Sequence, residues 1–308
     1  MNEDNQYDLS SMFASPWRAL FLGFVLLLLC IMFSAVTGQW LMSLFGGGAA
    51  TFNELARTQP GFTRFLQGLS NLLSWGLPAL FWAVYTGGFR RRLGFTTRPR
   101  GIFFGLAALT IVIALPFVES LLIQEESLHV TEGLEGFEEW AKDREVDTGK
   151  VILTLLKDTS FVGLFANVMV FAVIPAVSEE LFFRGFLLGT LKRSVGLHAA
   201  VWISATIFSI VHFQVLGLFS RIVLGAMLGY FYAYSGNLWA SIVAHFTHNL
   251  VNIVLAVLAL RGILPGDVTV GSFDFGIVVV ILSFFFTTLL VYYFSRKAHR
   301  FNSTLKYE

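Results

Sequence analysis

Long apolar runs constrain the fold of this chain more than any other feature of its sequence. A helix needs about 20 mostly apolar residues to cross a bilayer, and eight runs approach or exceed that length. Charged residues make up 13% of the chain, against about 25% in a soluble domain. We therefore expect an all-α polytopic membrane protein. We predict its spanning helices over residues 17–44, 65–85, 102–123, 161–191, 197–216, 218–234, 238–260 and 275–294.

The runs and the charges divide the chain into five regions. They are an N-terminal tail (1–16), three spans (17–123), an acidic external loop with an interfacial segment (124–160), a core of four spans (161–260), and a last span with a basic tail (261–308). With eight spans, twelve Lys and Arg residues fall on the side of the termini and seven on the other. Because basic loops stay inside, we expect both termini in the cytoplasm.

The charge also limits the partners. A formal net charge of +1 gives no support for nucleic acid as a partner, since nucleic-acid binding relies on basic surfaces. We expect the lipid bilayer as the surroundings.

The first polar cluster lies inside the span predicted over residues 161–191. Ionisable residues inside a span are costly and mark functional sites. Glu180 and Arg184 are four residues apart with the acid first, the favourable order on a helix, so we expect them to pair. Glu179 points about 100° away from Glu180 and has no local partner, which makes it a candidate base.

Two further clusters lie on later spans. One is Phe208 with His212. In the other, His245, His248, Asn249 and Asn252 share one helix face. At 1.5 Å per residue, Glu179 lies roughly 18 Å deep, His212 roughly 22 Å, and the span from His245 to Asn249 roughly 10 to 17 Å. These depths coincide near the middle of a core about 30 Å thick, so we predict that the helices enclose a polar chamber.

These groups suit the hydrolysis of an amide. A carboxylate beside a neutral histidine can take a proton from water, and a second His with an Asn can stabilise an oxyanion. We favour chemistry without a metal. The alternative is Zn²⁺ held by Glu179, His212 and His245. Two other functions stay open: a transporter that uses the cluster as a proton or ion relay, and a non-catalytic membrane partner.

At these residues the sequence resembles the CPBP family of intramembrane proteases (CAAX proteases, also called Abi proteins). The family pattern is Glu-Glu-x-x-x-Arg, Phe-x-x-x-His and His-x-x-x-Asn on successive membrane helices, and this chain has it at 179–184, 208–212 and 245–249. The resemblance implies an intramembrane endopeptidase that acts on a protein or peptide substrate, membrane-associated ones included. We expect it in a bacterial inner membrane.

The resemblance also implies residue roles. Glu179 activates water and His212 assists it, while His245 and Asn249 form the oxyanion site. Family members have been described both as glutamate proteases and as metalloproteases. The residues named above supply a base and oxyanion donors without a metal, which favours the glutamate type. We expect supporting roles for Glu180, Arg184, Phe208, His248 and Asn252.

Overall fold

The computed structural model describes residues 15–49, 51–86, 90, 93–95, 101–127, 135–212, 217–264 and 275–304, and every regular element in these ranges is helical. The first half contains α2 (Pro16–Phe45), α3 (Phe52–Thr58), α4 (Pro60–Asn71), the π-helix η1 (Leu72–Gly76), α5 (Leu77–Tyr85), α7 (Gly101–Ser127) and α8 (Glu135–Leu156). The second half contains α9 (Phe161–Val168), η2 (Met169–Val173), α10 (Ile174–Glu180), η3 (Leu181–Leu188), α11 (Gly189–Val195), α12 (Leu197–Ile210), α13 (Leu218–Ser235), α14 (Leu238–Leu260) and α15 (Ile277–Thr304).

Five of the described helical segments are long and apolar enough to cross a membrane. They are Pro16–Phe45, Gly101–Glu125, Phe161–Val195, Leu238–Leu260 and Ile277–His299. The outer helices α2 and α15 expose large apolar side chains, such as Phe21 at 67% and Ile277 at 71%, which suits contact with lipid.

The other three predicted spans are helical too, but they are shorter or more polar. Leu197–Ile210 is an apolar helix, but it is shorter than the five that are long enough to cross a membrane. The segment 60–85 and α13 contain more polar residues than the five apolar segments named above. By length and composition, five of the eight predicted spans are therefore found. The end of the run predicted over 197–216 includes residues 213–216, which lie outside the described residues.

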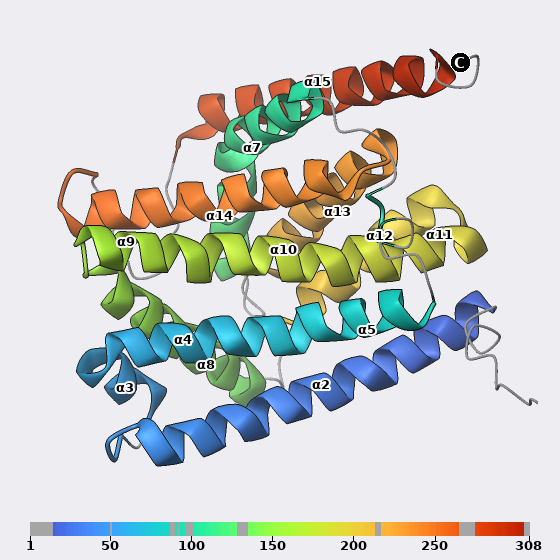
Figure 1. Ribbon diagram of the computed structural model, residues 1–308. Helices are drawn as coiled ribbons and strands as arrows, with labels where there is room; N and C mark the ends of the chain where they lie inside the picture. The colour runs from blue at the N-terminus through green and yellow to red at the C-terminus, as the bar shows by residue number, and fades with distance from the viewer. Residues whose placement is uncertain are drawn as a thin grey trace, which may run out of the picture.

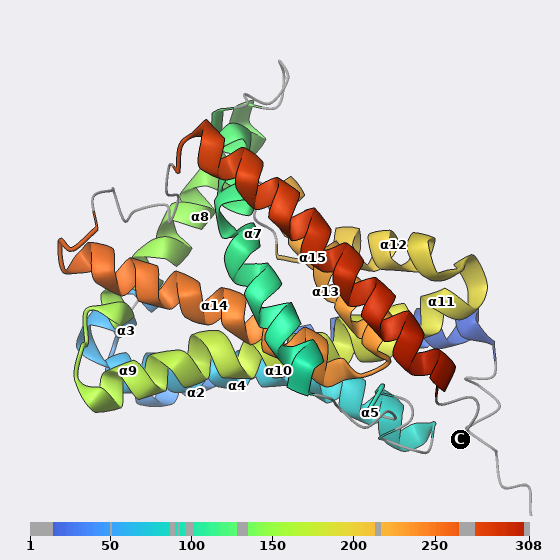
Figure 2. The same cartoon turned by 90° about the horizontal axis from the view of Figure 1, so that it is seen from above.

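The helices form a layered bundle (Figure 1). Helix α2 packs against the rod made by α4, η1 and α5, and this rod packs against α10. On its other side α10 contacts α14, which contacts α7, and α7 contacts α15. Helices α12 and α13 pack against each other, and seen from above α7 and α15 lie on the side of α14 away from α2 (Figure 2). The central position of α10 places Glu179 and Glu180 inside the bundle.

A short turn makes α13 and α14 neighbours. Gly236 ends α13 with φ +65°, a left-handed conformation that glycine adopts without a side-chain clash. Asn237 follows directly and caps α14, with its side chain accepting a hydrogen bond from the backbone N–H of Trp239 at 2.9 Å. The chain thus reverses within two residues, and α14 returns beside α13 with His245 two turns inside the helix.

The acidic segment is more helical than expected. Residues 124–150 were predicted as an external loop with 151–156 at the interface, but Glu135–Leu156 form α8 and residues 124–127 end α7. Glu, Lys, Arg and Leu are good helix formers, and the buried Leu155 and Leu156 anchor the end of α8. Polar composition therefore concealed a helix here. Residues 128–134 lie outside the described ranges.

A buried arginine ties α4 to the turn between α8 and α9. The Nε of Arg64 donates to Oδ1 of Asn167 at 2.8 Å, and its Nη2 donates to the Leu155 carbonyl at 2.9 Å and to Asp158 Oδ2 at 3.1 Å. The Asn167 amide donates to the same carbonyl at 3.0 Å. The guanidinium is thereby held by three acceptors.

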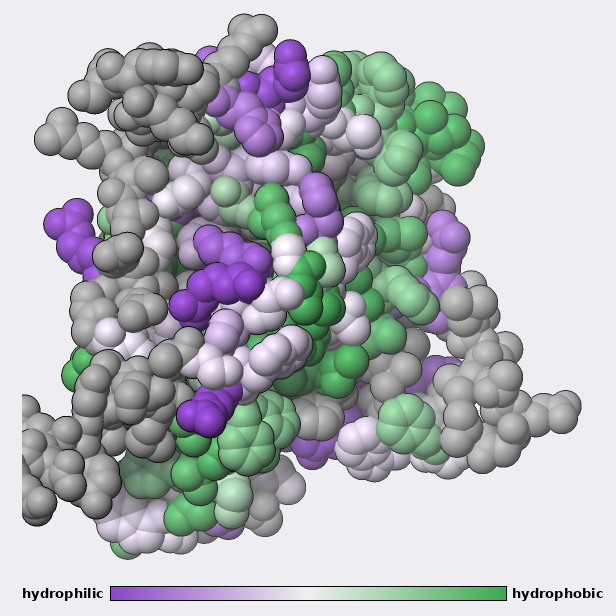
Figure 3. Space-filling model, turned by 90° about the vertical axis from the view of Figure 1, so that its right-hand side faces the viewer, coloured by the Kyte–Doolittle hydropathy of each residue, from purple (hydrophilic) through white to green (hydrophobic). Residues whose placement is uncertain are grey.

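Both ends of the described chain lie at the same end of the bundle, because α2 begins there and α15 ends there (Figure 1). Figure 3 looks onto this end, and hydrophilic side chains gather in its middle beside a hydrophobic flank. Helix α11 reaches the same end and carries the exposed residues Lys192 and Arg193 in its last turn.

Candidate active site

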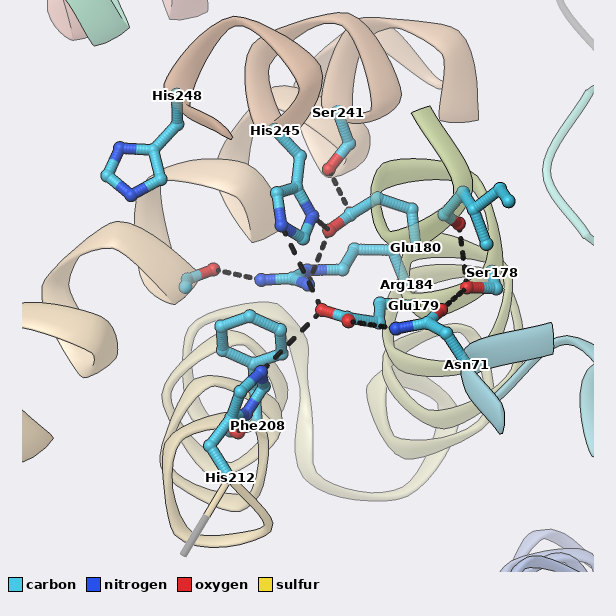
Figure 4. Close-up of polar contacts among 12 residues, drawn as sticks. Asn71, Ser178, Glu179, Glu180, Arg184, Phe208, His212, Ser241, His245 and His248 are labelled. Carbon is cyan, nitrogen blue, oxygen red and sulfur yellow. Dashed lines mark hydrogen bonds and ion pairs between the residues drawn. The ribbon is translucent and has the colours of Figure 1, made fainter. Parts of the chain in front are cut away.

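Three helices bring their polar side chains to one place in the bundle (Figure 4). Glu179 and Glu180 are the last residues of α10, His212 follows the end of α12, and His245 lies in the first half of α14. All but His212 are at least 95% buried. The structure thus brings together four residues that were predicted from three separate motifs.

Glu180 and Arg184 form a closed ion pair, as the sequence predicted. The Nη1 of Arg184 donates to Glu180 Oε1 at 2.7 Å, and neither side chain is more than 1% exposed. Arg184 Nη2 also donates to the backbone carbonyl of Gly225 at 2.9 Å. The guanidinium lies over the ring of Phe208, 4.7 Å from its centroid, a cation–π contact that gives the motif phenylalanine a structural role.

Glu180 has two further partners. Ser241 Oγ on α14 donates to Oε2, and Nδ1 of His245 lies 2.9 Å from Oε1. Both carboxylate oxygens are therefore used by groups fixed on helices. A buried charge with this many hydrogen bonds is stable in place but costly to disturb.

Glu179 has a different environment. Its Oε1 accepts a hydrogen bond from Nδ2 of Asn71 on α4 at 3.1 Å. Its Oε2 faces two imidazoles, with Nε2 of His212 at 3.7 Å and Nε2 of His245 at 3.9 Å. Both distances are too long for a direct hydrogen bond. One oxygen of Glu179 is held by a hydrogen bond, and the other lies beside two imidazoles without one.

The partners of the two Nδ1 atoms define the protonation of the imidazoles. His212 Nδ1 lies 2.6 Å from the Phe208 carbonyl, which can only accept, so Nδ1 carries a hydrogen. The same holds for His245 Nδ1 against Glu180. In a neutral imidazole the other nitrogen is then an acceptor. With both rings neutral, the two Nε2 atoms and Oε2 of Glu179 are therefore three acceptors close together, where a hydrogen donor is needed.

The net charge of the cluster supports the same conclusion. Two carboxylates and one guanidinium leave a charge of −1 when both imidazoles are neutral. A buried charge is costly without compensation, and a hydrogen donor beside Oε2 would provide it.

The remaining predicted residues on α14 lie outside this network. His248 Nε2 lies 3.1 Å from Asn252 Nδ2, so these two form a pair of their own. Asn249 is partly buried and takes no part in the contacts among Glu179, His212 and His245. The four residues predicted to share one helix face therefore do not act as one group: His245 joins the glutamates, His248 pairs with Asn252, and Asn249 is in neither set of contacts.

The donor set has the chemistry of a metal site. Both imidazoles donate through Nδ1 and present Nε2 toward a carboxylate, which is how histidine ligands are oriented at zinc sites. Within the described ranges, however, no group of three or more His, Cys, Asp or Glu side chains forms a candidate metal site.

Three residues at the site were missed by the sequence analysis: Asn71, Ser178 and Ser241. Ser178 Oγ donates to Oδ1 of Asn71. Asn71 is an amide within the apolar run 65–85, which is the signal that could have found it. The serines carry no such signal, because serine is common in membrane helices.

Comparison with known proteins adds one match. Residues 161–251 match a family model described as Rce1-like, type II CAAX prenyl endopeptidase. The matched segment contains all three motifs and ends before Asn252. No curated protein and no solved structure matches the chain.

Proposed function

We propose that this chain, whose residues 161–251 match a family model of Rce1-like type II CAAX prenyl endopeptidases, is an intramembrane endopeptidase of the CPBP family that activates water with Glu179. One observation carries the proposal. Oε2 of Glu179 lies 3.7 Å from Nε2 of His212 and 3.9 Å from Nε2 of His245, too far for a direct hydrogen bond. A water molecule that bridges these atoms would donate one hydrogen to Oε2 and the other to an imidazole, which is the geometry that a general base requires.

The reaction begins with proton transfer. Glu179 takes a proton from the water while the water oxygen attacks the carbonyl carbon of the peptide bond. His212, whose Nδ1 is fixed by the Phe208 carbonyl, accepts the second hydrogen of the water and orients it. The protonated Glu179 then gives its proton to the departing amine as the C–N bond breaks, so the base is regenerated.

We propose that His245 and Asn249 stabilise the oxyanion. Because Nδ1 of His245 already donates to Glu180, Nε2 can donate only when the ring is an imidazolium. A proton that neutralises the buried cluster supplies this form, and Glu180 lies beside it as the counter-charge. The Asn249 amide, free of the other contacts described above, provides the second donor.

We propose that no metal takes part. The proposed base and oxyanion donors are complete without one, and the described residues contain no candidate group of three or more metal ligands. Metal analysis of the purified protein, with activity measured before and after chelation, tests this. A stoichiometric metal whose removal abolishes cleavage contradicts the proposal.

We further propose that the remaining apolar helices also cross the bilayer, so that eight spans enclose a polar chamber and both termini lie in the cytoplasm of a bacterial cell. The position of both described ends at one end of the bundle supports an even number of crossings (Figure 1). Labelling of single cysteines at Lys192 and Ile263 with a membrane-impermeant reagent tests it. Equal labelling from outside intact cells contradicts it.

The substrate is proposed to be a membrane-associated protein or peptide. The assay uses the purified protein in liposomes with two peptides, one containing farnesyl-cysteine followed by three residues and one lacking the lipid. We expect the wild type to cleave at least one of them and Glu179→Gln to cleave neither. The matched control is Glu139→Gln, the same change at an exposed position of α8.

The outcome separates the proposed functions. Cleavage that survives Glu179→Gln removes the proposed protease mechanism. Proton or ion flux through the liposomes without cleavage favours a transporter instead.

A further inference from the structure

We propose that Asn71 is a positioning residue for the base, and that it supports Glu179 in both its ionised and its protonated form. This inference rests on the proposed protease function and adds to it a residue outside the matched segment 161–251. Asn71 ends α4, more than a hundred positions before Glu179 in the sequence. Its amide contacts Glu179 on one side and Ser178 on the other (Figure 4).

The first step of the argument concerns the orientation of the carboxylate. A carboxyl group rotates about its last bond unless an oxygen is held. Asn71 Nδ2 holds Oε1 at 3.1 Å, and this leaves Oε2 as the oxygen that faces the two imidazoles. Without Asn71, the described contacts contain no other hydrogen bond that distinguishes the two oxygens of Glu179.

The second step concerns Ser178, which orients the amide in turn. Its Oγ lies within hydrogen-bond distance of two acceptors, Oδ1 of Asn71 and the Ile174 carbonyl at 2.8 Å. A hydroxyl has one hydrogen, so it can serve only one acceptor at a time. When it donates to Asn71 Oδ1, the Nδ2 end of the amide is left to face Glu179, so Ser178 determines which end of Asn71 meets the base.

This arrangement suits both forms of Glu179. When Glu179 is ionised, the Ser178 hydroxyl donates to Asn71 Oδ1, and Nδ2 donates to the carboxylate. When Glu179 is protonated, it carries the proton of water on Oε2, the oxygen that faces the imidazoles. Oε1 is then the carbonyl oxygen of the acid and still accepts from Nδ2 of Asn71, so Asn71 and Ser178 keep the same hydrogen bonds. The base therefore changes its protonation without leaving a polar atom of Asn71 or Ser178 unpaired.

The same rod also contacts the assisting histidine. Trp75, one turn after Asn71 and inside η1, stacks on the ring of His212 with the centroids 6.4 Å apart and the planes at 13°. The π-helix η1 begins directly after Asn71, and such turns often occur at functional sites. The rod formed by α4, η1 and α5 therefore touches both partners of the proposed water.

The test is a double-mutant cycle on kcat with the farnesyl-cysteine peptide. Asn71→Leu keeps the size of the side chain and removes its hydrogen bonds. We expect kcat to fall about 10- to 100-fold, the loss typical of one hydrogen bond to a charged group. KM should stay within about twofold, because Asn71 does not touch substrate. Ser178→Ala should lower kcat less, and the double variant should match Asn71→Leu alone, since Ser178 acts through Asn71.

Asn167→Leu is the matched control. Asn167 is also an amide with both ends engaged, but its partners are Arg64 and the Leu155 carbonyl. We expect it to lower Tm and to leave kcat per folded molecule unchanged. If Asn71→Leu does not fold, Asn71→Asp replaces it, because it has the same shape and lacks the amide donor.

The results distinguish the two proposals. If Glu179→Gln is inactive while Asn71→Leu keeps the wild-type kcat, the role of Asn71 is wrong and the protease function stands. Losses of kcat that add up in the Ser178→Ala, Asn71→Leu double variant also contradict the inference that Ser178 acts through Asn71. Activity that survives Glu179→Gln contradicts the function itself.

Discussion

Glu179 and Glu180 are adjacent in the sequence and buried in the same helix, yet their surroundings differ. Glu180 contacts Arg184, Ser241 and His245, and both of its oxygens are occupied. Glu179 has one oxygen held by Asn71, and the other lies beside two imidazoles without a hydrogen bond. A fully paired carboxylate contributes to structure, whereas a carboxylate with an open oxygen is available for chemistry.

The largest expected effect comes from the open carboxylate. Glu179→Gln should lower kcat about 10²- to 10⁴-fold, the range for loss of a general base. Its Tm should change little, because the amide can still accept from Asn71. Peptide cleavage and thermal unfolding of the same preparation check both parts. A large fall in Tm with kcat preserved per folded molecule would reverse the roles assigned to the two glutamates.

The paired carboxylate should show the opposite pattern. Glu180→Gln removes the carboxylate that pairs directly with the buried Arg184, which costs about 3 to 5 kcal/mol in the free energy of unfolding. Thermal or denaturant unfolding measures this loss. A variant as stable as the wild type would mean that Glu180 is not the counter-charge of Arg184.

The two histidines should divide in the same way. His212→Gln removes the more exposed imidazole, whose side chain is 25% exposed, and should lower kcat about 100-fold with little change in Tm. His245→Gln also breaks the contact with Glu180 and should lower both quantities. Equal effects of the two variants on Tm would contradict this division.

A smaller effect is expected at Ser241. Ser241→Ala removes one hydrogen bond to Glu180 and should cost about 1.5 to 3 kcal/mol of stability, as for hydrogen bonds to charged groups. Ser204→Ala is a suitable control, because Ser204 is equally buried but donates to a neutral carbonyl, that of Phe183. A loss at Ser204 as large as at Ser241 would show that charge does not matter here.

The smallest effect should come from a carboxylate at the bundle surface. Hydrogen bonds from the Ser160 hydroxyl and backbone N–H, with a contribution from Arg64, hold the pKa of Asp158 below its usual value. A lowered pKa stabilises the fold above the unfolded pKa, about 3.9, and this stabilisation is lost as the pH falls through the folded pKa. The Tm of the wild type should exceed that of Asp158→Asn near pH 6, and the difference should shrink toward pH 3. A difference that grows on acidification would contradict the assigned contacts.

The sequence was sufficient where the relevant interactions are local. The pairing of Glu180 with Arg184 follows from a spacing of four residues on a helix, and it is confirmed at 2.7 Å. The helical class follows from long apolar runs, and five of them have the length and composition of spans. The acidic segment 135–156 was missed as a helix because its polar face gave no apolar periodicity.

The tertiary structure decided everything that depends on contacts between distant helices. Nothing local links Asn71 to Glu179 or Ser241 to Glu180, since these partners lie far apart along the chain. The tautomer of His245 likewise follows from a carboxylate on another helix. The sequence determined which groups are buried, because placing charged residues in apolar helices has few stable outcomes. Only packing determined that Oε2 of Glu179 makes no hydrogen bond to another side chain, whereas both oxygens of Glu180 do. Hydrogen bonds act over about 3 Å, so they depend on how the helices meet.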